Sequence, residues 1–89
     1  MNKNILVVFT ISTDNLPNNF QEIIKHELEI IAQWKAEGIL EQFFLKQTKN
    51  GAVLVFKDID EAKAKDLMET LPLYQFVKSV EYFDLIKQF

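Results

Sequence analysis

Residues 39–56, ILEQFFLKQTKNGAVLVF, contain two apolar segments on either side of a polar turn. Ile39–Lys46 and Ala52–Phe56 are rich in aromatic, β-branched and other apolar residues, which favours strands. Thr48-Lys49-Asn50-Gly51 connects them, and Asn-Gly at the centre of such a turn is a strong hairpin signal. We therefore predict a β-hairpin made of the second and third strands of the chain.

The sequence before this hairpin predicts one strand and one long helix. Ile5–Ile11 is apolar and β-branched, which is typical of a buried strand. After a turn-rich loop, Asn18 or Asn19 can cap a helix that runs from Phe20 to about Glu37, where apolar residues recur with helical spacing. Gly38 then ends the helix as a C′ glycine.

The sequence after the hairpin predicts a second helix and a last strand. Asp58 or Asp60 can cap a helix that extends to about Leu71. Pro72 ends it, because proline cannot continue a helix. Phe76–Ile86 has strand character but is interrupted by charged residues.

The element order is strand, helix, strand, strand, helix, strand, in a single domain of residues 1–89. This order predicts the α+β class and a ferredoxin-like βαββαβ fold, with a four-stranded antiparallel sheet and two helices on one face. The other face has no helix to cover it, although the first and third strands are apolar on both sides. We therefore predict that it meets another copy of the chain in a homodimer.

Composition excludes several classes of function. The net charge is −3, and the chain has ten Lys but no Arg, which argues against nucleic-acid binding and leaves Lys or backbone N–H groups to meet any anion. The chain has no Cys and one His, so thiolate chemistry and a histidine-rich metal site within one chain are excluded. No stretch is long and apolar enough to predict a membrane span or signal peptide, so we expect the cytoplasm.

Glu27 is the one charged residue in the middle of the apolar stripe of the first helix. At about 100° per residue, Phe20, Ile23, Ile30 and Trp34 flank it. Burial of a carboxylate raises its pKa, which suits a general base or acid near neutral pH. Glu27 therefore either moves protons in a pocket between helix and sheet, or is a structural carboxylate that bonds a Tyr, a Lys or the backbone or extends into solvent at a loosely packed end.

Three other side chains have a functional and an ordinary interpretation. His26 lies at the border of the stripe and is either a second catalytic group or a partly exposed polar residue. Trp34 is either a core residue or a stacking surface for substrate. Tyr74 either offers its hydroxyl to a pocket or packs in the core.

The second strand contributes two further candidates. Gln42 lies between Leu40 and Phe44, and strict alternation places all three on one face. Gln42 is either a hydrogen-bond donor to a ligand or a sheet-edge residue, and Phe44 is a candidate wall of the same substrate site.

Short motifs occur along residues 5–83: Glu27-Leu28-Glu29 with Ala36-Glu37-Gly38, Val55-Phe56 and Leu71-Pro72-Leu73-Tyr74. Together they resemble the pattern of the muconolactone δ-isomerase family. The resemblance implies a dimeric α+β barrel, with dimers assembled into larger rings. It also implies a cofactor-independent isomerase of aromatic-compound catabolism, which moves a double bond in an unsaturated lactone and has Glu27 as its helix carboxylate.

This chain departs from that family at the second strand. The family has Trp, Arg and His there, whereas this chain has Leu40-Glu41-Gln42-Phe43-Phe44. The departure predicts a less charged lactone, an enone or another enolisable substrate.

Three functional hypotheses follow. The first is a muconolactone-class isomerase with Glu27 as proton carrier and Gln42, Tyr74 or backbone N–H groups as oxyanion donors. The second is a cofactor-free monooxygenase on the same barrel. The third is a non-catalytic module that binds a small molecule or supports assembly, in which Glu27 is structural.

Overall fold

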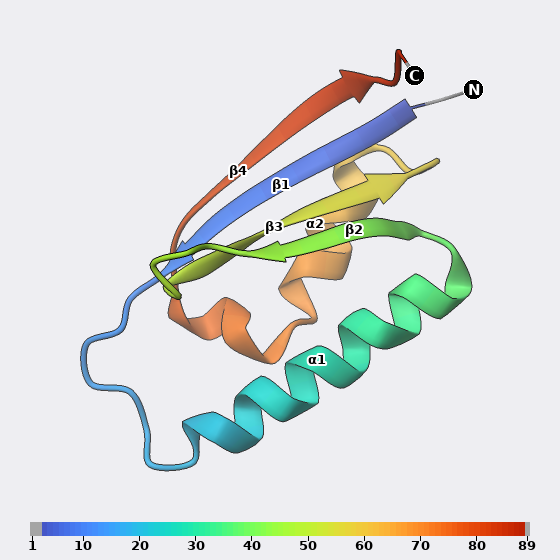
Figure 1. Ribbon diagram of the computed structural model, residues 1–89. Helices are drawn as coiled ribbons and strands as arrows, with labels where there is room; N and C mark the ends of the chain where they lie inside the picture. Colours follow the sequence, from blue (N-terminus) through green and yellow to red (C-terminus); the bar gives the residue numbers. More distant parts are fainter. Residues whose placement is uncertain (1–2, 89) are drawn as a thin grey trace.

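The structure, a computed structural model, describes residues 3–88 and has the predicted ferredoxin-like βαββαβ fold. Four antiparallel strands form a sheet in the order β2-β3-β1-β4, and both helices cover one face of it (Figure 1). The elements are β1 (Lys3–Ile11), α1 (Phe20–Glu37), β2 (Leu40–Leu45), β3 (Gly51–Lys57), α2 (Glu61–Glu69), the 3₁₀ helix η1 (Pro72–Phe76) and β4 (Val77–Ile86).

The core lies between the sheet and the helices. Side chains of β1 and β3 alternate strictly, so that Ile5, Val7 and Phe9 are buried opposite Leu54 and Phe56. From the helices, Ile31, Trp34, Ala64 and Met68 complete it. Trp34 is buried, and its ring centroid lies 5.6 Å from that of Phe56, so its side chain packs in the core.

The opposite face of the sheet, which we call the outer face, has no helix over it. Its apolar side chains alternate with the core residues of β1 and β3 and continue onto the two edge strands. They are Leu6, Val8, Phe44, Val53, Val55, Phe83 and Leu85. Phe44 is 53% exposed and Phe83 43% exposed, so this chain alone leaves a continuous apolar surface in water.

A β-bulge in β2 corrects the prediction that Leu40, Gln42 and Phe44 share a face. Leu40 pairs with Phe56 and Gln42 with Val55, which leaves Glu41 as an extra residue. Because an extra residue reverses the alternation, Leu40 is buried under the helices while Gln42 and Phe44 are exposed on the outer face.

The turn between β2 and β3 also differs from the predicted one. Lys46 N–H donates to the Gly51 carbonyl at 3.0 Å, and Lys49, not Asn50 or Gly51, has the left-handed backbone, with φ of 62°. Gly51 already belongs to β3, where an added Cβ would lie 2.1 Å from the Phe9 carbonyl oxygen. The glycine is therefore required by close packing of two strands.

Helix α2 ends earlier than predicted, and the chain forms another helical turn after it. Asp60, rather than Asp58, caps α2 by accepting from Lys63 N–H at 2.8 Å. The helix ends at Glu69, and Pro72 does not simply stop it but begins η1.

At the end of α1, Gly38 has φ of 82° and its N–H donates to Lys35 O, which confirms the predicted C′ glycine.

We predict that Gly51→Ala destabilises the fold more than Gly38→Ala does. The first adds a methyl group against backbone atoms of β1 and is expected to cost about 1–3 kcal/mol or more. The second adds a methyl group in open space, so only the left-handed backbone opposes it, at about 1 kcal/mol. Urea unfolding of both variants measures the difference, and equal losses would contradict the close approach of β3 to β1.

Candidate functional site

Glu27 lies in the middle of α1 with its carboxylate under the η1 segment. Its side chain is 3% exposed, which confirms the burial that the helical stripe predicts. Oε1 accepts a hydrogen bond from Leu73 N–H at 3.0 Å. This N–H has no helical partner, because Leu73 stands in the first turn of η1, directly after Pro72. The Leu71-Pro72-Leu73-Tyr74 motif thus presents a free backbone donor to Glu27.

The Glu27 side chain also lines a pocket. No hydrogen bond to its second carboxylate oxygen, Oε2, is found among residues 3–88, and in the same residues no fully enclosed side-chain oxygen or nitrogen lacks a partner. Oε2 is therefore not fully enclosed by the protein. The adjoining pocket has a volume of about 190 Å³ and is bounded by β1, α1, the β2–β3 hairpin and η1. Apart from Glu27, Gly51 and Lys49, its lining is apolar: Phe9, Ile11, Phe20, Ile24, Leu28, Phe43, Leu45, Ala52 and Leu73.

Burial raises the pKa of Glu27 from 4.5 to about 6. The main cause is the loss of water around the carboxylate, and the hydrogen bond from Leu73 N–H opposes it by stabilising the charged form. A carboxyl group with this pKa is mostly ionised at neutral pH and can still hold a proton briefly, as a proton carrier must. Glu27 therefore has both the backbone bond of the structural interpretation and the pocket of the functional one.

The other candidate residues lie elsewhere. His26 is exposed on α1. Gln42 and Phe44 are on the outer face, away from the Glu27 pocket. Tyr74 is half-buried and borders Glu27 and Leu73 on the side of η1, outside the pocket itself. Of the six predicted residues, the structure thus brings Glu27 and Tyr74 together, and the catalytic or binding role of each stays a prediction.

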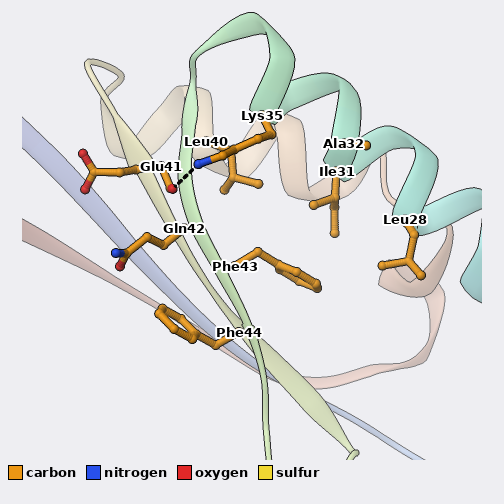
Figure 2. Close-up of a pocket in the computed structure, with 9 residues that line it drawn as sticks. All are labelled: Leu28, Ile31, Ala32, Lys35, Leu40, Glu41, Gln42, Phe43 and Phe44. Carbon is orange, nitrogen blue, oxygen red and sulfur yellow. Dashed lines mark hydrogen bonds between the residues drawn. The ribbon is translucent and has the colours of Figure 1, made fainter.

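A second, more open depression lies along the free edge of β2. It has a volume of about 490 Å³ and lies between β2 and residues 28–35 of α1. Figure 2 shows Leu40 and Phe43 directed toward the helix, whereas Gln42 and Phe44 point to the other side of the strand. Lys35 crosses the depression to donate to the Glu41 carbonyl at 2.7 Å (Figure 2). No buried titratable group lines this depression, so the Glu27 pocket is the better candidate for chemistry.

Two contributors to the site were missed from the sequence. Leu73 acts through its backbone N–H, and Lys49 lines the Glu27 pocket from the hairpin turn. The Pro at residue 72 was a signal for the first, because the residue after it has a free N–H in a new helical turn. Nothing in the sequence around Lys49 marks it as a pocket residue.

The structure is similar to known structures over nearly its whole length. Muconolactone isomerase matches with a TM-score of 0.76 and 19% identity, over 96% of this chain and 90% of that one. A 5-chloro-2-hydroxyhydroquinone dehydrochlorinase of Burkholderia phenoliruptrix, in complex with 2,5-dihydroxybenzoquinone, matches at 0.60 and 11%, over 90% of each chain. A NIPSNAP family protein of Agrobacterium tumefaciens matches at 0.60 and 15%, over 100% and 96%. These likenesses show the ferredoxin-like fold.

No protein-family model and no curated protein matches the sequence. Within residues 3–88, no helix is long and apolar enough to cross a membrane, and no cluster of three or more potential metal-ligating side chains is present.

We predict that Glu27→Gln removes a component of the pH dependence of stability. Since the folded pKa is raised, the folded state holds the extra proton between pH 4.5 and about 6. Stability from this group is therefore present below pH 4.5, is lost as the pH rises through about 6, and then stays level, a loss of about 2 kcal/mol. The amide of Gln can still accept from Leu73 N–H, so the fold is retained.

Urea unfolding at a series of pH values measures this effect. The free energy of unfolding of Glu27→Gln, relative to wild type, should increase as the pH rises across that window. Glu29→Gln is the matched control, because Glu29 is exposed on the same helix. If both variants follow the wild-type pH profile, Glu27 is not buried as an ionisable group.

Proposed function

We propose that this protein is a cofactor-independent isomerase that moves a proton, and with it a double bond, in a small unsaturated lactone or related enolisable compound. The observation that carries the proposal is the buried Glu27 carboxylate: one oxygen accepts from Leu73 N–H, the other has no hydrogen bond within residues 3–88, and the side chain lines an apolar pocket. The overall likeness to muconolactone isomerase, whose name describes this kind of reaction, supports it.

Glu27 alone can perform both proton transfers. As a carboxylate, Oε2 takes a proton from a carbon conjugated with the substrate carbonyl, and the C–H electron pair moves into the conjugated system to form a dienolate. The carboxylic acid so formed returns the proton to another carbon of the same system, which shifts the double bond without oxidation or reduction. The hydrogen bond from Leu73 N–H holds Oε1 in place, so that Oε2 is the oxygen that faces the substrate in both steps.

The apolar lining suits this chemistry. It keeps water away from the carboxylate, which raises the pKa of Glu27. A donor for the dienolate oxygen is still needed. Neither predicted side-chain donor lines the pocket, because Tyr74 borders Glu27 from outside it and Gln42 lies on the outer face, so we propose a backbone N–H group as the donor.

Proton NMR in D₂O, with muconolactone and neutral butenolides as substrates, tests the proposal. Wild-type protein should migrate the double bond or incorporate deuterium, and Glu27→Gln should lower the rate by about 10²–10⁴-fold, the usual contribution of a general base. The rate should rise with pH through about 6 as Glu27 ionises. Glu29→Gln should retain wild-type activity. Absence of both double-bond migration and deuterium incorporation with folded protein would instead favour the monooxygenase or the non-catalytic binding module.

We also propose that the outer face is covered by a second copy of this chain in a homodimer. All four strands place apolar side chains on this face, and burial of these side chains would be favourable by the hydrophobic effect. The predicted larger ring of dimers would need further contacts.

Light scattering on a sizing column tests the dimer. We expect the mass of two chains for wild type and of one chain for a Phe44→Lys, Phe83→Lys double variant, because both side chains lie on the outer face. Ile86→Lys is the control, since Ile86 is 81% exposed at the end of β4, on the side of the sheet that the helices cover. A wild-type monomer, or a dimer that survives the double substitution, would contradict the proposal.

A further inference from the structure

The Glu27 pocket has a single cation at its rim. Lys49 is exposed in the β2–β3 turn, whereas Glu27 is buried, so the two charges of the lining lie at different depths. The lining between them is formed by side chains such as Phe9, Phe43 and Leu73. A molecule bound in the pocket would therefore face the Glu27 carboxylate at its inner end and the Lys49 ammonium group at its outer end.

The backbone of Lys49 is held in place by the turn. Its φ is 62°, and its N–H donates to the Lys46 carbonyl at 2.8 Å. Lys46, the nearby lysine of the same turn, is occupied elsewhere, because its Nζ donates to Thr10 Oγ1 at 2.6 Å. The turn thus separates its two lysines, one bound to β1 and one placed at the pocket.

The ammonium group of Lys49 has no protein partner within residues 3–88. The ion pairs found there join Lys65 to Glu61 and Lys87 to Glu41. Lys49 forms no ion pair with Glu27, although both line the same pocket. Its positive charge is therefore available to a ligand, and the chain has no Arg that could take this role.

From this arrangement we propose that the Glu27 pocket selects small molecules with an apolar body and one anionic group, and that Lys49 binds the anionic group at the rim. The negative charge of Glu27 repels the anion from the inner end, so the apolar part of the ligand is directed toward Glu27. An anionic ligand differs from the less charged substrate that residues 40–44 predict, because the cation that binds it, Lys49, lies outside that segment.

This inference concerns the pocket of the proposed function but is tested by binding alone. The probes are phenylacetate and its neutral analogue phenylacetamide, which have similar shape and differ in charge. Titrations of ¹⁵N-labelled protein at pH 7.5 would follow the amide signals of Leu73 and Lys49, one at each end of the pocket. We expect phenylacetate to bind about fivefold more tightly than the amide, as for a partly exposed ion pair, and the preference to diminish at high salt.

Three variants assign the preference to Lys49. Lys49→Gln should abolish it, and Lys49→Arg should retain it. Lys25→Gln should also retain it, because Lys25 is an exposed lysine of α1 that does not line the pocket. Equal affinity of the two probes, failure of both to bind, or a preference unchanged in Lys49→Gln would overturn the inference.

Failure here and failure of the proposed function have different signatures. Anion selectivity without any proton exchange would leave Lys49 as the selective group of a binding protein. Proton exchange that depends on Glu27 but not on Lys49 would leave the isomerase and remove the anion site.

Discussion

The hydrogen bond from Leu73 N–H to Glu27 is the interaction on which the site depends. It joins the middle of α1 to the first turn of η1, 46 residues further along the chain. Without a donor, a carboxylate that is 3% exposed would be costly to ionise, and without the carboxylate the N–H that follows Pro72 would lack a partner. Each group thus provides the hydrogen-bond partner that the other lacks, and the bond holds η1 against α1.

This one bond also sets the chemical character of the pocket. Desolvation and the bond act on the Glu27 pKa in opposite directions, and desolvation is the larger effect, so the pKa settles at about 6. The bond occupies one oxygen only, which leaves the other for a ligand. A rigid carboxylate in an apolar pocket is thereby obtained without a metal-binding cluster or a second buried charge in the described part of the chain.

Most of the fold could be predicted because its determinants are periodic. The alternation in β1 and β3 and the helical stripe of α1 depend on many residues, so single exceptions do not change the outcome. The errors came from features that depend on one residue. The extra residue Glu41 forms a bulge, which places Gln42 and Phe44 on the outer face. In the turn, Lys49 adopts the left-handed conformation that the Asn-Gly pair was expected to supply.

The candidate site could be predicted only where a side chain violates a pattern. Glu27 is a charge inside an apolar stripe, so the sequence shows it. The Leu73 donor is a backbone group, for which Pro72 indicates a free N–H but not its partner, and Lys49 is an ordinary lysine in a polar turn. Both reach the site through tertiary contacts between segments that are distant along the chain.

The most direct test of this account is a carbon-13 NMR titration of the Glu27 side-chain carboxyl, with the Leu73 amide proton observed in the same samples. The account predicts a carboxyl midpoint at about pH 6 and a Leu73 amide shift with the same midpoint. A midpoint near the ordinary value of 4.5, or a Leu73 amide that does not respond, would contradict it.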